Sequence, residues 1–420
     1  MLLNRDRALG VMEEFGVDAL LGTTPVNLTY LSDYSPWLHW VYRLYTRENF
    51  QFQHYALFPR DQGTSAAIIA PSRPSNLAHY VQWPSWIEDV YLHGPAWDSG
   101  PEPLPEHPPE LHRLYRVATI GAEKRSKTAG AALVRALRDR GLTRGVIAVD
   151  KEGMNPKELE HAMAELPDLQ WKEAGELFRY IRMVKTPEEI ALLRQSAEVN
   201  WEGFKALLKA AVPGNTEIQL SRAYRAEVSL EGGSPVFCNN ACGPWAVNHW
   251  EPRDYALRPG DTIYCDAGCT YNHYNSDTNV SAVLGEPTKR HRELFDAMSS
   301  GLDAATAAVK PGARLSEVLA AFKEGTLAGG AIKSFSGFGH AVGLEARDLP
   351  MIQQPFAIAE DDVIRVSTDF VLEPGMVFNL EDNKRVLGLG SVAVEDTLLV
   401  TATGCESLTP QKREIVVLPA

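Results

Sequence analysis

The sequence LRPGDTIYCDAGCTYNHYNSDTNVSAVL, residues 257–284, holds two aspartates eleven positions apart, Asp266 and Asp277. Apolar and β-branched residues at 262–265 and 280–284 predict strands on either side of the pair. A single aspartate is most often a solvated surface group. Whether the two aspartates form a metal site therefore depends on further potential ligands later in the chain.

Three further potential metal ligands follow, each in a tight local context. His340 stands in Gly-Phe-Gly-His, Glu381 in Asn-Leu-Glu-Asp, and Glu395 in Ala-Val-Glu-Asp-Thr, fourteen positions after Glu381. Four carboxylates and one imidazole are suitable donors for two divalent cations held close together. Two such ions, about 3.5–4 Å apart, share a hydroxide that is nucleophilic at neutral pH. The set predicts a metal-dependent hydrolase.

These motifs resemble those of the creatinase, prolidase and aminopeptidase P family of "pita-bread" proteins. Within that family, the chain is most similar to the Xaa-Pro peptidases. The resemblance is strong from about residue 182 to 403 and loose before that. It implies a creatinase-like α/β domain followed by an α+β pita-bread catalytic domain. Besides the five residues, it is carried by RMVKTPEEI (182–190), LRPGD (257–261), GHAVGLE (339–345) and LEPGMVF (372–378).

The resemblance implies a role for each of the five residues. Asp266 is expected to chelate one ion and His340 the other. Asp277 and Glu395 are expected to bridge the ions, with Glu381 completing the second site. Two divalent metal ions are thus the expected cofactors. Manganese is favoured, and cobalt, iron or zinc would be accepted by the same donors.

The resemblance also implies how catalysis would proceed. The bridging hydroxide would attack the substrate carbonyl, whose oxygen is polarised by a metal ion. Glu381 is expected to carry the proton from water to the leaving group. His249, in Val-Asn-His-Trp, matches an active-site histidine of the family that is not a ligand, and would donate to the oxyanion or hold the substrate backbone. The alternative is a surface histidine beside Trp250.

Two positions depart from the family pattern. Arg347 stands seven positions after the ligand histidine, where peptide-cleaving members usually keep a second histidine. Ala393 stands two before the last glutamate, where members that cleave near proline commonly carry an arginine. Arg347 is expected either to bind a substrate carboxylate bidentately or to pair with Asp348 or Glu345. The departures leave the metal ligands intact and bear on the substrate.

Three functions of different classes follow. The leading one is a dinuclear metallopeptidase that cleaves a bond beside proline, as a dipeptidase or an aminopeptidase. The second is a hydrolase or lyase of the same family that acts on a non-peptide metabolite, which the altered residues favour. The third is a peptidase-like binding module, which the complete ligand set disfavours. A short peptide or small molecule is the expected partner.

Length and local patterns predict two domains, 1–183 and 184–420. The first alternates helix and strand, and a Pro- and Gly-rich loop is expected over 94–109. In the second, Thr186 as N-cap, Pro187 and Glu189 predict a helix start. The other elements predicted are helices over 5–15, 127–140 and 290–308, and strands over 18–21, 65–69 and 146–149.

Bulk properties limit the partners and the compartment. The formal net charge of −13 argues against nucleic acid and anionic membranes as partners. No apolar run approaches the length of a membrane-spanning helix. The first residues carry no secretory signal, so the cytoplasm is the expected location.

Two other patterns, a set of cysteine pairs and a glycine-rich segment, resemble a zinc site and a dinucleotide-binding site but have simpler explanations. The pairs Cys238/Cys242 and Cys265/Cys269 fit zinc-site spacing only loosely, and buried thiols are favoured. The segment GLGSVA at 388–393 matches a dinucleotide-binding pattern but does not open a helix. A hairpin between strands that carry the two glutamates explains its glycines.

The N-terminal part contains a dense aromatic stretch. It is expected to pack within the domain or at a homodimer interface, or to line the partner's active site with aromatic faces. Because aromatic clusters also suit protein interfaces, an oligomer is favoured, and a homodimer is expected. The residues concerned are Tyr34, Trp37, Trp40, Tyr42, Tyr45, Phe50, Phe52 and Tyr55, with His39 and His54 between them.

Overall fold

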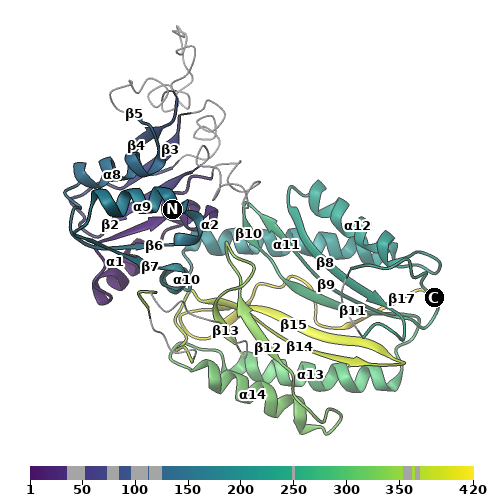
Figure 1. Cartoon of the computed structure of the whole chain (residues 1–420). Helices are drawn as coiled ribbons and strands as arrows, with labels where there is room; N and C mark the ends of the chain where they lie inside the picture. Colours follow the sequence, from purple (N-terminus) through teal and green to yellow (C-terminus); the bar gives the residue numbers. More distant parts are fainter. Residues whose placement is uncertain are drawn as a thin grey trace. The chain divides into compact units, whose positions relative to one another are not determined.

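The structure is a computed structural model that describes residues 1–35, 53–72, 85–95, 112, 125–247, 251–352, 362–364 and 369–420. The chain divides into two compact units (Figure 1). The first consists of Met1–Ile181 with Ala357–Val366, and the second of Arg182–Phe356 with Ser367–Ala420. The chain therefore enters the second unit, returns once to the first, and ends in the second.

The first unit is built around a mixed sheet. Among the described residues its seven strands follow the order β5-β4-β3-β2-β1-β6-β7. Strand β2 runs antiparallel to β1 and β3, and the other neighbours are parallel. The strands are β1 (Ala19–Gly22), β2 (Tyr55–Pro59), β3 (Ala67–Pro71), β4 (Asp89–His93), β5 (Arg125–Ser126), β6 (Gly145–Val149) and β7 (Leu169–Glu173).

Helix α8 (Ala129–Asp139) shows why helices form beside this sheet. Thr128 Oγ1 accepts a hydrogen bond from Ala131 N at 3.2 Å and so caps the helix. Leu133 and Leu137 lie on one face, are fully buried, and share a core with Ile147 of β6. Among the described residues, the unit's other helices are α1 (Arg5–Glu14), α2 (Pro25–Ser32), the 3₁₀ helix η3 (Lys151–Gly153), α9 (Pro156–Glu165) and α10 (Gly175–Arg182).

The elements predicted for this half are confirmed, with shifts of one or two residues at their ends. The predicted helices are α1 and α8, and the predicted strands are β1, β3 and β6. Residues 96–109, most of the predicted loop, lie outside the described part of the chain.

Only the ends of the aromatic stretch are described. Tyr34 and Tyr55 are fully buried, and the Tyr34 ring lies 5.9 Å from that of His54. These three side chains pack inside the first unit. The members that lie outside the described residues are Trp37, His39, Trp40, Tyr42, Tyr45, Phe50 and Phe52.

In its described residues, the second unit holds two sheets. The first has the order β10-β9-β11-β17, with β8 also paired to β9, and the second has the order β13-β12-β14-β15-β16. Helices α11 and α12 contact the first sheet, and α13 contacts the second, with α14 against α13 (Figure 1). The helices are α11 (Pro187–Ala210), α12 (Glu217–Leu230), α13 (Lys289–Ala308) and α14 (Leu315–Ala328). The strands are β8 (Ser234–Cys242), β9 (Thr262–Tyr271), β10 (Tyr274–Asn275), β11 (Thr278–Leu284), β12 (Phe338–Ala341), β13 (Asp348–Ile352), β14 (Val377–Val386), β15 (Gly390–Val400), β16 (Cys405–Ser407) and β17 (Ile415–Leu418).

Helix α11 begins as the sequence predicts. Thr186 N donates to Glu189 Oε2 at 2.8 Å, and Glu189 N donates to Thr186 Oγ1 at 3.2 Å, which completes a capping box. The hydroxyl of Tyr274 donates to the other oxygen of Glu189 at 3.1 Å. The start of the helix is thereby joined to β10, next to Asp277.

The segment GLGSVA belongs to the turn and first residues of a hairpin, as predicted. Strands β14 and β15 pair antiparallel around it, and Gly388 and Gly390 adopt φ of 89° and 105°, which favour glycine. The register places Glu381 directly opposite Glu395.

The cysteines of the second unit are thiols. All five are free, and the four on β8 and β9 are buried, as predicted. The closest pair of sulfurs that the structure shows, Cys238 and Cys265, is 3.8 Å apart. Within the described ranges, no helix combines the length and the apolar character needed to cross a bilayer.

Candidate metal centre

The two aspartates are positioned by the pairing of β9 with β11. Asp266 lies on β9 opposite Asn279, and Asp277 immediately precedes β11. Gly268, in the Asp-Ala-Gly motif, permits the turn between them: a Cβ there would lie 2.5 Å from Ser276 O. Only glycine therefore fits two positions after Asp266 without moving the chain that leads to Asp277.

His340 is placed by β12, which runs close against β14. A Cβ on Gly339 would collide with Asn379 O, so glycine is required beside the histidine. His340 N donates to Asn379 Oδ1 at 2.9 Å. The ring Nδ1 lies 3.1 Å from Ala341 O, and because a carbonyl only accepts, Nδ1 carries the proton. This tautomer leaves a lone pair on Nε2, as metal ligation requires.

The glutamates are held by the hairpin and by two asparagines. Asn279 Nδ2 donates to one oxygen of Glu395 at 2.9 Å, and Asn379 Nδ2 donates to the other at 2.8 Å. Asn379 therefore contacts both the Glu395 carboxylate and the His340 backbone. Glu381, opposite Glu395, is 7% exposed.

The structure brings the five predicted ligands together. Asp266, Asp277 and Glu395 offer oxygens that all lie within 4.8 Å of one another. His340 Nε2 lies 3.4 Å from Asp277 Oδ2. Burial and the nearby Asp277 charge raise the pKa of Glu381 to about 8. Burial, with the neighbouring carboxylates, also raises the pKa of Asp266 and of Glu395.

These residues fit divalent cations. Several like charges gathered in a buried place repel one another unless cations neutralise them. Within the described residues, the buried Nε2 of His340 has no hydrogen-bond partner, and it faces the Asp277 carboxylate. An imidazole lone pair and four carboxylates that converge in this way form the donor set of a metal centre rather than a structural ion pair.

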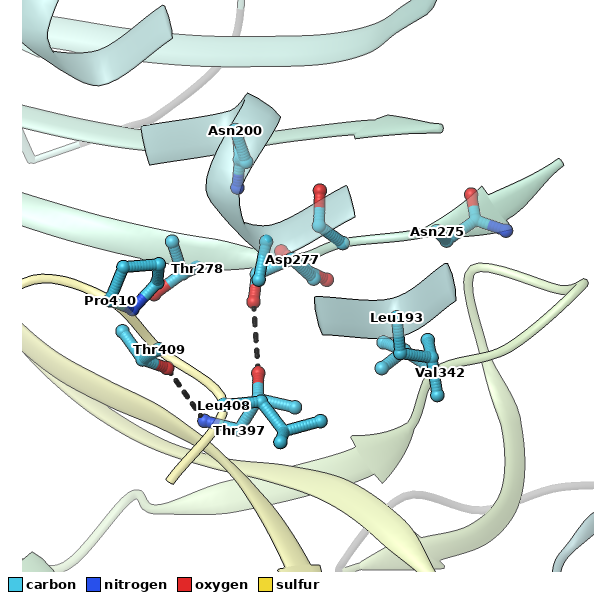
Figure 2. A pocket seen from close by; sticks show the side chains of 12 residues that line it. Leu193, Asn200, Asn275, Asp277, Thr278, Val342, Thr397, Leu408, Thr409 and Pro410 are labelled. Carbon is cyan, nitrogen blue, oxygen red and sulfur yellow. Dashed lines mark hydrogen bonds between the residues drawn. The ribbon is translucent and has the colours of Figure 1, made fainter. Parts of the chain in front are cut away.

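A small pocket that Asp277 helps to line shows how its chain segment is held (Figure 2). Thr397 Oγ1 donates to the backbone oxygen of Asp277 at 3.4 Å, and Thr397 N donates to Thr409 Oγ1 at 3.0 Å. Leu193 of α11 and Leu408 supply apolar parts of the lining. Strand β15 therefore carries both Glu395 and, two residues later, a support for Asp277.

Residues 191–402 match metallopeptidase family M24. The chain belongs to this family. As an M24 member it is a metal-dependent hydrolase, and the matched region contains all five side chains of the centre.

Relatives of this M24 chain include two proteins named Xaa-Pro dipeptidase. The one from Pyrococcus furiosus is 28% identical over 257 residues, which cover 59% of this chain and 69% of the relative. The one from Lactobacillus delbrueckii subsp. lactis is 28% identical over 278 residues, which cover 65% and 72%.

Solved structures confirm the pita-bread fold of this M24 member together with its creatinase-like first unit. The X-Pro aminopeptidase from Thermotoga maritima aligns with a TM-score of 0.72 at 19% identity, over 97% of this chain and 100% of that one. The prolidase from Pyrococcus horikoshii aligns with a TM-score of 0.69 at 21% identity, over 98% and 99%.

A buried ionic cluster surrounds the chain near Arg347. Arg182 Nη2 donates to Glu345 at 2.7 Å and to Asp348 at 3.2 Å, and Lys185 Nζ donates to Asp348 at 3.4 Å. Both acids expected as structural partners of Arg347 thus bind Arg182. Arg347 itself is exposed, and its positive charge opposes the rise in the pKa of Glu381 that burial causes.

Sequence reasoning missed the asparagines that support the centre. Asn279 lies two residues after Asp277, and Asn379 two residues before Glu381. Because alternate residues of a strand share a face, an amide two positions from a ligand is the signal that could have revealed them. His249 lies outside the described residues.

Asn379→Ala is expected to lower metal affinity about 10- to 100-fold, since Glu395 loses one of its two amide donors and His340 N loses its acceptor. Titration of metal-stripped protein with Mn²⁺ against a competing chelator measures the effect. Asn383→Ala, four positions along the same strand, is the matched control and should bind as the parent does. Equal affinities for the two variants would contradict the supporting role of Asn379.

Proposed function

We propose that this chain is a dinuclear metallopeptidase that cleaves the peptide bond next to proline, as a dipeptidase or an aminopeptidase of the Xaa-Pro type. The observation that carries the proposal is the convergence of three carboxylates and a histidine with a free Nε2 lone pair in a member of family M24. The names of the Xaa-Pro dipeptidase relatives support the choice of bond.

The five side chains would hold two divalent ions. By the family resemblance, Asp266 and His340 would each serve one ion, Asp277 and Glu395 would be shared by both, and Glu381 would complete the second site; the proximity of Asp266, Asp277, Glu395 and His340 supports these roles. When bound, the ions activate a water molecule and polarise the scissile carbonyl. The oxygen-rich donor set favours manganese.

The protein's own groups would then position the substrate and move the proton. Glu381, buried beside the other ligands, accepts a proton on its carboxylate and passes it to the leaving nitrogen. His249 donates to the carbonyl oxygen as negative charge develops there. Arg347, exposed and electrostatically close to Glu381, binds an anionic end of the substrate.

The proposal extends to a homodimer that works in the cytoplasm. The five free cysteines support a reducing compartment. The homodimer rests on the family resemblance and on the aromatic stretch of the first unit.

The second candidate function is hydrolysis or lysis of a non-peptide metabolite by the same centre. The observations that favour it are Arg347 and Ala393, which stand where a histidine and an arginine are usual in peptide-cleaving relatives. The metal ligands would be unchanged, so only the substrate distinguishes the two candidates.

A substrate panel tests the proposal. Protein stripped by a chelator and reloaded with Mn²⁺ is assayed on Xaa-Pro dipeptides and Xaa-Pro-Yaa tripeptides, with Xaa-Ala peptides of equal length as controls. We expect metal-dependent cleavage that prefers proline, and the preferred length distinguishes a dipeptidase from an aminopeptidase. No cleavage by protein with its metals bound would overturn the proposal in favour of the non-peptide substrate.

A further inference from the structure

Another cavity of the second unit is bordered by Glu395. Asn279, which donates to the Glu395 carboxylate at 2.9 Å, also lines it. Gln411 and Arg413, which precede β17, line it from the C-terminal part of the chain. The volume of about 40 Å³ exceeds the roughly 10–15 Å³ that one water molecule needs. A candidate metal ligand and the C-terminal part of the chain therefore share one small cavity.

Three buried polar atoms belong to residues that line this cavity and have no hydrogen-bond partner in the described part of the chain. They are Asn279 Oδ1, Gln411 Oε1 and Arg413 Nη1. The two amide oxygens accept hydrogen bonds and the guanidinium nitrogen donates one. A buried polar atom that stays unbonded costs free energy, and buried water molecules usually bond about three such atoms at once. The three atoms together thus form a suitable site for water.

The Asn279 amide has a single favourable orientation. Its Nδ2 faces the Glu395 carboxylate, where a carbonyl oxygen would meet a second acceptor instead of a donor. The side chain is buried, with 6% of the residue exposed, so Oδ1 on the other side of the amide depends on a donor from the cavity. A hydrogen bond to Oδ1 would therefore hold Nδ2 on Glu395.

The charges that line the cavity favour a neutral ligand. The guanidinium of Arg413 opposes a metal cation, and the carboxylates of Glu395 and Asp396 oppose an anion. A water molecule can donate to both amide oxygens and accept from the guanidinium. Its hydrogen-bonding capacity matches the three atoms without adding charge.

Gln411 also contacts the chain next to Asp277 directly. Its Nε2 donates to Thr278 Oγ1 at 3.3 Å, and Thr278 is the residue after Asp277. The other end of the same amide, Oε1, belongs to the cavity that Asn279 lines. One side chain therefore lies between the supports of two candidate ligands, Asp277 and Glu395.

We propose that Gln411 is a positioning residue of the metal centre, and that it acts on Asn279 through a water molecule bound in this cavity. The water accepts from Arg413 Nη1 and donates to the amide oxygens of Asn279 and Gln411, so that Asn279 Nδ2 stays on Glu395. The inference deepens the proposed function and rests on it, because that function assigns Glu395 to the metal ions.

Gln411→Met tests the role of the side chain, because it keeps the length of the side chain and removes both amide groups. In the full chain, Mn²⁺ affinity should fall about 3- to 10-fold, as for loss of one hydrogen bond. The visible absorption spectrum of the Co²⁺-loaded protein should also change, since it depends on the geometry of the ligands. Gln195→Met, the same substitution at an exposed position of α11, is the control and should match the parent in both measurements.

Unchanged Mn²⁺ affinity in Gln411→Met would overturn the assignment. So would a lower affinity with the parent's Co²⁺ spectrum, because a merely structural role would leave the geometry of the ligands as it is. Neither measurement needs a peptide substrate.

A crystal structure of the parent protein, at a resolution that shows ordered water, tests the bridge itself. We expect a water molecule that bonds Asn279 Oδ1, Gln411 Oε1 and Arg413 Nη1, and its loss from Gln411→Met. A water that bonds only one of these atoms, or none at all, would overturn the water-mediated role.

The outcomes separate this inference from the proposed function. If the parent cleaves no Xaa-Pro bond, yet its metal affinity and the bound water depend on Gln411, the proposed function fails and the inference stands. If the parent cleaves Xaa-Pro peptides and Gln411→Met binds Mn²⁺ as the parent does, the inference fails alone.

Discussion

Asp277→Ala is expected to abolish metal retention and to lower kcat/KM by more than about a thousandfold, since loss of metal catalysis removes several kcal/mol of transition-state stabilisation. The effect should be this large because Asp277 lies close to three of the other four residues of the centre. Its carboxylate lies within 4.8 Å of ligand oxygens of Asp266 and Glu395 and 3.4 Å from His340 Nε2. Metal content per chain after dialysis and peptidase activity are the two measurements.

Asp303→Ala is the control for this variant, because it removes an exposed carboxylate paired with Arg413, outside the five-residue set. It should keep both metal and activity. Turnover that survives in Asp277→Ala would show that the bridging role belongs to another residue.

Asp348→Ala is expected to destabilise the second unit by about 3–5 kcal/mol. Asp348 is 1% exposed and accepts hydrogen bonds from both Arg182 and Lys185. Its removal leaves two buried cations without this carboxylate, and the cost of an uncompensated buried charge exceeds that of a lost surface pair. Denaturant unfolding of the full chain measures the change in stability.

Glu286→Ala is the matched control, because Glu286 is exposed and pairs at 3.0 Å with the exposed Arg292. It should cost less than about 1 kcal/mol. Equal losses in the free energy of unfolding for the Asp348 and Glu286 variants would contradict a stabilising role for the buried cluster.

Local signals were enough to predict several elements. The capping box of Thr186 and Glu189 lies within four residues, so the start of α11 follows from the sequence. The turn between β14 and β15 follows from Gly388 and Gly390, which take up backbone angles that other residues avoid. The five candidate ligands could be proposed from the sequence because each is flanked by a short motif that resembles the family.

Other features depend on strand register and on distant parts of the chain. The contact of Asn279 with Glu395 joins residues 116 positions apart, and that of Arg182 with Asp348 spans 166. Periodicity along one segment does not determine which residues of two distant strands face each other.

The return of the chain to the first unit has a consequence for its synthesis. Val363 N donates to Glu173 O at 2.8 Å, and Glu176 N donates to Asp362 Oδ2 at 3.1 Å, so a late segment adds to the edge of an early structure. On the ribosome, residues 1–181 emerge long before Asp362 does. The N-terminal unit therefore stays unfinished at this edge while most of the catalytic unit is translated. The maturation of the two halves is interleaved, instead of proceeding one domain after the other.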